Sequence, residues 1–232
     1  MEIKQSATFE DFKSLAKSYN IETNNNQLEL FKKYHEILIE WNKKINLISR
    51  KGEGSIIEKH FLDSILFLPE IEKLDVINHV STNVLDIGSG GGFPAIPLSI
   101  MKSEWKFTLS ESIKKKADFL KHLVKELDIK NVEIINACVE TLHTTSLQTN
   151  IKYDFITARA VAKLKDLIKY AIPILKPGGY LLAYKSKNIE DEINDAKKIM
   201  EKTCNGRITL PLQIFSKEIN GVERRLVIIS LN

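Results

Sequence analysis

The stretch from Val84 to Pro97, which reads VLDIGSGGGFPAIP, constrains the fold of this chain more than any other. Apolar residues run into an acid and a glycine cluster, and Pro94 then opens a new apolar segment. This order predicts a strand, a tight turn and a helix. Glycine has no Cβ and adopts φ > 0 readily, so the backbone at the turn can approach a ligand closely. Pro94 suits the first turn of a helix, where its missing N–H costs little. The stretch therefore predicts a binding site for a nucleotide-like cofactor.

The spacing of the glycines separates two classes of cofactor site. A dinucleotide site requires GxGxxG or GxGxxA after the strand. Phe93 occupies the position of that third small residue, which disfavours a dinucleotide-dependent oxidoreductase. The pattern DxGxGxG, from Asp86 through Gly88 and Gly90 to Gly92, resembles instead the first motif of class I S-adenosylmethionine (AdoMet) methyltransferases. A tight turn without a ligand is the alternative, but short strand-to-helix loops ordinarily need fewer glycines.

Composition and charge narrow the class of protein. With 232 residues and 43% apolar content, the chain can bury a substantial core. It shows no signal peptide and no apolar run of membrane-spanning length, so a cytoplasmic protein is expected. Cys138 and Cys204 lack metal-ligand spacing and are interpreted as reduced thiols.

Positive charge is concentrated in the part of the chain that contains the glycine turn. Residues 1–80 carry 11 Lys and Arg against 13 Asp and Glu, and residues 81–232 carry 23 against 17. The excess favours an anionic partner such as nucleic acid, although solvated lysine faces are an alternative explanation.

The order of the predicted elements indicates an α/β fold. Residues 1–80 predict helices, one of them amphipathic with Leu28, Phe31, Leu38 and Trp41 on one face, packed as a helical extension beside a sheet. Residues 81–232 alternate strands with helices, which predicts a doubly wound, mostly parallel sheet of seven strands. After the glycine turn, the expected strands are Lys106–Glu111, Val132–Ala137, Tyr153–Thr157, Tyr180–Tyr184, Ile208–Phe215 and Val222–Ser230. The last two are expected to form an antiparallel hairpin at the sheet edge.

The helices between these strands follow from their apolar spacing. Ile113, Ala117, Leu120, Val124 and Leu127 are expected on one buried helix face. Leu164–Leu175 and Asp191–Lys202 predict further helices, and Lys176–Gly179 (KPGG) predicts a turn. The whole pattern matches the class I AdoMet-methyltransferase variant of the Rossmann-like fold.

In such a sheet the ligand lies at the carboxyl ends of the strands. Glu111 ends the second strand, where its carboxylate can accept hydrogen bonds from both ribose hydroxyls. Val139 and Glu140 follow the third strand, where they can contact the face and edge of an adenine, and Arg159 follows the fourth. Each has a structural alternative: Glu111 as an acid at a helix N-terminus, Glu140 as a solvated acid, Arg159 as an ion-pair partner. Their occurrence together at three strand ends favours a ligand site.

Taken together, the ordered motifs resemble the bacterial glucose-inhibited division protein B family, whose members methylate guanine N7 in 16S rRNA. The resemblance covers almost the whole chain and is carried by Trp41–Leu47 (WNKKINL), His60 with Leu62–Ser64, Leu85–Pro97, Thr108–Ser112 and Thr157–Ala160. It implies AdoMet as the cofactor and 16S rRNA in the small ribosomal subunit as the partner. A monomer without a metal ion or a membrane association is expected.

The resemblance also assigns roles to individual positions. The AdoMet contacts of the family fall on Gly88, Phe93, Val139, Glu140 and Arg159, and its basic RNA-facing positions fall on Lys115, Lys185 and Arg224. Gly90 and Glu111 join the cofactor site by the reasoning above. Many family members have arginine where this chain has Cys138, so one RNA or substrate contact would have to come from neighbouring lysines. His60 and Asp63 are interpreted as a structural pair on one helix.

The chemistry requires little from side chains. Guanine N7 has an in-plane lone pair and loses no proton, so no general base and no catalytic residue is assigned. Alignment of N7, methyl carbon and sulfur can supply about 7–11 kcal/mol of barrier reduction. Because N7 faces a deep, narrow groove in A-form RNA, the target base is expected in a loop or extruded. A cation beside methylated guanine would be unfavourable, so Arg159 is interpreted as an anchor for the cofactor carboxylate.

Two other functions fit the same residues. A methyltransferase for a small molecule or a protein would be expected to carry a lid or a closed pocket instead of a basic rim. A non-catalytic AdoMet- and RNA-binding protein would bind the cofactor without methylating any RNA.

Overall fold

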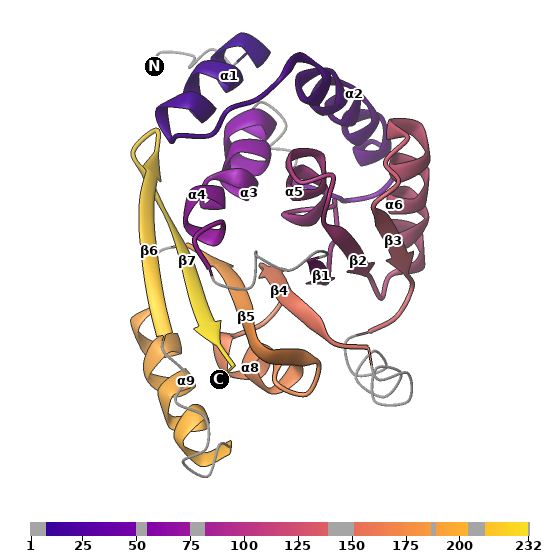
Figure 1. Ribbon diagram of the computed structural model, residues 1–232. Coiled ribbons are helices and arrows are strands. Elements are labelled where there is room, and N and C mark those ends of the chain that lie inside the picture. Colours follow the sequence, from indigo (N-terminus) through magenta and orange to yellow (C-terminus); the bar gives the residue numbers. More distant parts are fainter. Residues whose placement is uncertain are drawn as a thin grey trace.

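The computed structural model describes residues 8–49, 55–74, 82–138, 151–186, 189–203 and 212–231. Its centre is a seven-stranded sheet in the order β3-β2-β1-β4-β5-β7-β6 (Figure 1). The strands are β1 Asn83–Ile87, β2 Lys106–Ser110, β3 Val132–Ile135, β4 Tyr153–Arg159, β5 Leu175–Lys185, β6 Leu212–Ile219 and β7 Val222–Ser230. Pairs among β1 to β5 are parallel, and β7 runs antiparallel to both β5 and β6. The predicted fold, including its antiparallel edge hairpin, is confirmed.

The register of the central strands explains where a site can form. Ile87 at the end of β1 lies opposite Ser110 at the end of β2 and opposite Ala158 near the end of β4. The residues that follow these three strand ends therefore meet at one edge of the sheet. This edge brings the glycine turn, Glu111 and Arg159 together.

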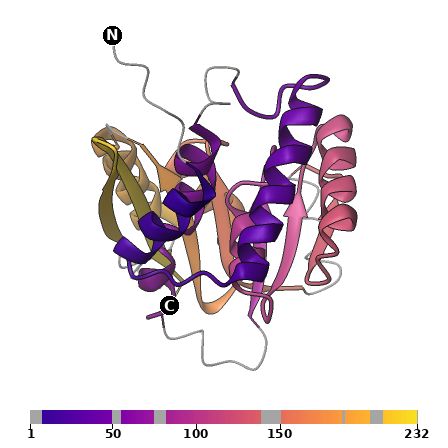
Figure 2. The ribbon, with the colours of Figure 1, turned by 90° about the horizontal axis from the view of Figure 1, so that it is seen from above.

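Helices cover both faces of the sheet. The first face carries α1 Phe9–Ser18, α2 Asn25–Asn42, the π-helix η2 Ile57–Leu62, α3 Asp63–Ile65, α4 Leu68–Ile71, α5 Ala95–Met101 and α6 Lys114–Leu127. The second face carries α8 Leu164–Ala171 and α9 Glu190–Thr203. Seen from above, α2 lies beside α6, where Trp41 packs on Phe119 at 5.6 Å between ring centroids (Figure 2). Thr8 and Asn24 begin α1 and α2 with capping boxes, which satisfy free N–H groups of the first turn.

A buried aromatic cluster joins the N-terminal helices to the glycine turn. Phe12 packs on Phe31 at 4.9 Å, Phe31 on Phe61 at 5.2 Å, and Tyr34 contacts both Phe61 and Phe93. The first-face core is continuous through these rings. A boundary between residues 80 and 81 stays a prediction, and the continuous core indicates that the two parts stabilise each other.

Some predicted bounds differ from the structure. The KPGG segment lies inside β5 rather than before it, at a register irregularity between Tyr153 and Phe155 of β4. A Cβ on Gly179 would lie 2.9–3.1 Å from three backbone oxygens, so the glycine marks close strand packing. The predicted strand at Ile208 begins outside the described residues, and β6 starts at Leu212. α8 ends at Ala171, four residues before the predicted end.

Within the described parts of the chain, no helix has both the length and the apolar character needed to cross a membrane.

Candidate active site

The glycine turn is held by backbone hydrogen bonds to the end of β2. Gly88 and Ser89 donate their N–H groups to the Ser110 carbonyl at 2.9 and 3.1 Å. Gly88, Gly90 and Gly92 have φ of +68°, +54° and +95°, which side-chain-bearing residues rarely adopt. A Cβ on Gly88 would lie 2.7 Å from Cγ2 of Val161, so the turn also packs against the segment after β4.

Glu111 braces this turn from the end of β2. Its Oε2 accepts the Gly90 N–H and its Oε1 accepts the Ile113 N–H, both at 2.8 Å, and the side chain is 5% exposed. The structural role predicted as an alternative is therefore present. Each oxygen keeps a second lone pair, so the carboxylate can still accept a ribose hydroxyl.

Two exposed apolar side chains flank the turn. Ile113 is 51% exposed and Val161 is 42% exposed. The assignment of Ile113 to the buried face of α6 was wrong, because Ile113 precedes the helix in an extended conformation and its side chain is exposed. Val161 was missed, since nothing local distinguishes it from a core valine. Both offer exposed apolar surface beside the turn.

Asp86, the acid of the glycine motif, is fully buried at the same edge. Its Oδ1 accepts the Thr157 hydroxyl at 2.6 Å, while Oδ2 has no hydrogen-bond partner among the described residues. Burial raises the pKa of Asp86 to about 7. The carboxyl group retains an oxygen that a cationic ligand can satisfy.

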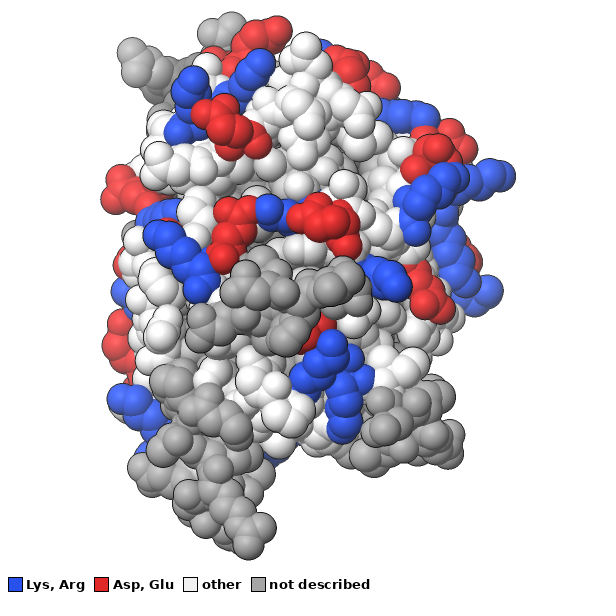
Figure 3. Space-filling model, viewed as in Figure 1, with Lys and Arg blue, Asp and Glu red and all other residues white. Residues whose placement is uncertain are grey.

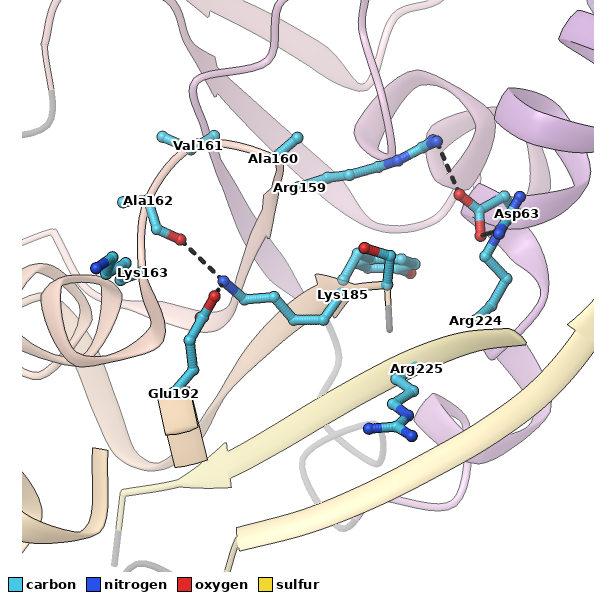
Figure 4. Close-up of a pocket in the computed structure, with 12 residues that line it drawn as sticks. Asp63, Arg159, Ala160, Val161, Ala162, Lys163, Lys185, Glu192, Arg224 and Arg225 are labelled. Atoms are coloured by element: carbon cyan, nitrogen blue, oxygen red, sulfur yellow. Dashed lines mark hydrogen bonds and ion pairs between the residues drawn. The ribbon is translucent and has the colours of Figure 1, made fainter. Parts of the chain in front are cut away.

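Arg159 extends from β4 toward the N-terminal helices, where it pairs with Asp63 (Figure 4). Its Nη2 lies 2.8 Å from Asp63 Oδ2 and donates to the Lys59 carbonyl at 2.6 Å. Arg224 Nε lies 3.0 Å from the other oxygen of Asp63. Burial raises the pKa of Asp63, against the attraction of the two arginines. The structural alternative for Arg159 is thus present, and the described charge partners of Asp63 are two arginines rather than His60.

Arg159 nevertheless retains binding capacity. Its Nη1 is buried and makes no hydrogen bond to any residue the structure describes. The guanidinium lies 5.8 Å from the centre of the Phe93 ring, directly beside the glycine turn. Phe93 itself stacks between Tyr34 at 5.5 Å and His60 at 4.8 Å, and burial lowers the pKa of His60 to about 3. His60 is therefore a neutral ring that stacks on Phe93, and its Nδ1 lies 3.5 Å from Arg159 Nη2.

A cavity of about 570 Å³ opens beside this edge, between the carboxyl ends of β4 and β5, the start of β7 and the start of α9 (Figure 4). Ala160, which follows β4 and lies in the wall of this cavity, has a φ of +56° in the left-handed region. The cavity is lined by Asp63, Arg159, Ala160, Val161, Ala162, Lys163, Tyr184, Lys185, Ser186, Glu192, Arg224 and Arg225. A larger cavity of about 980 Å³ lies near the amino ends of β1, β2 and β3, away from the edge where ligands bind in such sheets.

The 570 Å³ cavity at the sheet edge brings together Arg159, Lys185 and Arg224, which are far apart in the sequence. Lys185 is mostly buried and donates to Glu192 Oε2 at 2.7 Å and to the Ala162 carbonyl at 2.9 Å. Glu192 was missed, because it reads as one of several solvated acids at the start of a helix. Lys185 and Arg224 are thus paired with acids within the cavity wall.

The remaining predicted residues lie elsewhere. Lys115 is exposed on α6, a helix over which lysines gather on the surface (Figure 3). Val139 and Glu140 fall outside the described residues, and Cys138, just before them, is exposed.

The parallel sheet with its antiparallel hairpin, the glycine turn after β1 and the acid after β2 define a class I AdoMet-dependent methyltransferase. Two solved structures share the fold. The METTL16 MTase domain aligns with 100% of this chain and 97% of its own, with a TM-score of 0.62 at 13% identity. An O-methyltransferase from Bacillus cereus in complex with SAH aligns over 97% of this chain and 100% of its own, with a TM-score of 0.59 at 12% identity.

Within that class, the chain belongs to the GidB family, rRNA small subunit methyltransferase G, whose family model matches residues 27–218. The ribosomal RNA small subunit methyltransferase G of Lactococcus lactis subsp. lactis is 37% identical over 96% of this chain and 90% of its own length. That of Streptococcus pneumoniae is 38% identical over 82% of this chain and 78% of its own length.

Proposed function

We propose that this protein transfers the methyl group of AdoMet to N7 of a guanine in 16S rRNA of the small ribosomal subunit. Membership of the rRNA small subunit methyltransferase G family over residues 27–218 carries this proposal. The geometry supports it, since a cavity large enough for a nucleobase shares the Arg159–Val161 wall with the glycine turn.

The residues at the sheet edge fit AdoMet. Gly90 leaves open space at the turn, since the nearest atom to the position of its Cβ is the Gly88 carbonyl oxygen at 3.9 Å, and Glu111 retains acceptor capacity for the ribose. The unpartnered Nη1 of Arg159 suits the methionine carboxylate, and the unpartnered Oδ2 of Asp86 suits a cationic group. Phe93, Val139 and Glu140 complete the proposed cofactor site.

The chain contributes to the reaction mainly by positioning. AdoMet supplies an electrophilic methyl group when bound. Guanine N7 needs no deprotonation, so the residues around the cavity have to orient the base, exclude water and keep N7 in line with the methyl group. Lys185 and Arg224 are proposed to contact the RNA from the cavity, and Lys115 from the open face of α6. Their paired acids partly neutralise Lys185 and Arg224 near the reacting base.

We also propose that the protein acts as a cytoplasmic monomer and uses no metal ion. Attack by a neutral lone pair on a sulfonium methyl requires neither a Lewis acid nor a second active subunit.

The reaction is tested by transfer of labelled methyl from AdoMet to small-subunit particles and to naked 16S rRNA from a strain without its own enzyme. Labelled N7-methylguanosine at one mapped site is expected, and the better acceptor identifies the assembly stage at which the enzyme works. AdoMet binding without methylation of either RNA would support the non-catalytic alternative, and methylation of another acceptor would support a different substrate.

Arg159→Lys is expected to raise the dissociation constant of AdoMet about 10- to 100-fold, because a charged hydrogen bond to the carboxylate is lost while one positive charge remains near Asp63. Isothermal titration calorimetry of the folded variant measures this. Arg225→Lys is the matched control, since Arg225 pairs with Glu190 and Glu223 and points away from Arg159 in Figure 4. Unchanged AdoMet affinity in Arg159→Lys would show that Arg159 is only an ion-pair residue.

A further inference from the structure

The proposed function leaves open which part of the RNA Lys185 and its paired acid, Glu192, recognise. Glu192 at the start of α9 and Lys185 at the end of β5 point toward each other across the cavity wall (Figure 4). Two hydrogen bonds from described residues reach Glu192, from Lys185 at 2.7 Å and from the Leu164 N–H at 2.9 Å, and both end on Oε2. Its Oε1 has no hydrogen-bond partner in the described part of the chain.

Lys185 is similarly incomplete as a donor. Its ammonium group carries three N–H bonds, and the described acceptors are Glu192 Oε2 and the Ala162 carbonyl. The pair therefore presents one further donor directly beside one further acceptor. Both belong to side chains that line the cavity, where Lys185 is 12% exposed and Glu192 is 29% exposed.

Guanine carries the complementary pair on its Watson–Crick edge. Its O6 accepts a hydrogen bond, and the adjacent N1–H and N2–H₂ groups donate. Adenine reverses this pattern, with an N6–H₂ donor beside an N1 acceptor. In the same position, its N6–H₂ donor would face the Lys185 ammonium and its N1 acceptor would face the Glu192 carboxylate. A site with fixed, desolvated polar groups rejects a mismatched base strongly, because its own groups are left unpaired.

We propose that Glu192 and Lys185 together select guanine, with Glu192 Oε1 accepting from N1–H and N2–H₂ and Lys185 donating to O6. This inference rests on the proposed function, and it assigns the specificity for the base to a carboxylate on α9. N7 lies on the adjacent Hoogsteen edge, on the other side of O6 from N1–H, and that edge then faces the glycine turn across Arg159–Val161.

The charge of Glu192 also suits the reaction. Methylation of N7 places a positive charge on the purine, and that charge spreads toward N1–H. A fixed carboxylate at this edge stabilises the developing charge. It also offsets the ammonium of Lys185, which would otherwise oppose the reaction.

The inference is tested with 16S rRNA that is prepared by ligation and carries either guanosine or inosine at the target position. The RNA is used in the form that the wild-type enzyme methylates, either naked or in a reconstituted particle. Inosine keeps N7, O6 and N1–H and lacks only the N2 amino group. Wild type is expected to prefer guanosine by about 10- to 100-fold in kcat/KM, the effect of one hydrogen bond to a charged group. In Glu192→Ala the preference is expected to fall below about fivefold, because the acceptor of that bond is gone.

Controls separate this result from a folding defect. Glu192→Gln keeps an acceptor for the Leu164 N–H and is expected to retain AdoMet affinity while losing about tenfold or more in kcat/KM with guanosine. Asp195→Asn lies one turn further along α9, pairs with Lys165 at 3.5 Å and is expected to behave as wild type.

The outcomes distinguish the inference from the function beneath it. An equal loss of kcat/KM with the guanosine and inosine RNAs in Glu192→Ala, or no preference for guanosine in wild type, would overturn the role of Glu192 in selecting the base. Either result would leave the proposed methyltransferase function standing. Failure of wild type to methylate even the guanosine RNA would instead overturn the proposed function, and the inference with it.

Discussion

Gly92→Ala is expected to reduce the free energy of unfolding by roughly 2–6 kcal/mol, which is the sum of the backbone strain and the overpacking. The same crowding is expected to abolish measurable AdoMet binding at micromolar protein concentration. Gly92 has φ of +95°, and a Cβ there would lie 2.6 Å from Tyr34 Oη and 2.8 Å from Ile96 Cγ1. Tyr34 cannot yield easily, because it is fully buried, stacks on Phe93 and donates to the Gly91 carbonyl. Urea denaturation and AdoMet titration measure the two effects.

The chain supplies a matched control for this substitution. Gly178 has φ of +76°, but no atom lies within 4 Å of the position its Cβ would take. Gly178→Ala is therefore expected to cost only the conformational part, about 1 kcal/mol. Tyr34→Phe removes the hydroxyl nearest the added Cβ and is expected to restore part of the stability lost in Gly92→Ala. Equal losses in the two glycine variants would show that crowding at the turn contributes nothing.

Asp63→Asn is expected to lower the free energy of unfolding by about 3–5 kcal/mol, because it leaves two arginines mostly buried without their carboxylate. Arg159 and Arg224 reach Asp63 at 2.8 and 3.0 Å from β4 and β7, so the loss weakens the contact between α3 and the sheet. Urea denaturation by circular dichroism measures the change. Glu40→Gln, which breaks an exposed pair with Lys44, is expected to cost less than about 0.5 kcal/mol.

A double-mutant cycle identifies the cause of that loss. If uncompensated charge destabilises Asp63→Asn, then adding Arg224→Gln removes one of the two arginines that lack a carboxylate partner. The double variant is then expected to be more stable than the sum of the two single losses predicts. Additive losses would attribute the effect to packing of the side chains rather than to their charges.

The sequence determined the sheet and the position of the cofactor turn. Both follow from local signals: alternating apolar segments set the strands, and the DxGxGxG spacing with Pro94 set the turn between β1 and α5. Because the carboxyl ends of parallel strands share one edge, the sequence also placed Glu111 and Arg159 beside the glycines before any contact was known.

Only the tertiary structure decided what these side chains pair with. Arg159 meets Asp63, 96 positions earlier in the chain, and Arg224 meets the same carboxylate from β7. Glu192 became a candidate through its hydrogen bond with Lys185 in the wall of a cavity. Ile113 was assigned to a buried face because its spacing matches the stripe of α6, yet an extended residue before a helix does not follow the helical period.

The physical reason for this division is the range of the interactions. Strand, turn and helix preferences arise from a residue and its near neighbours in the chain, so they can be inferred from the sequence. Ion pairs, buried unpartnered atoms and cavities depend on which distant segments the packed core brings together, and one carboxylate looks like another until that packing is known.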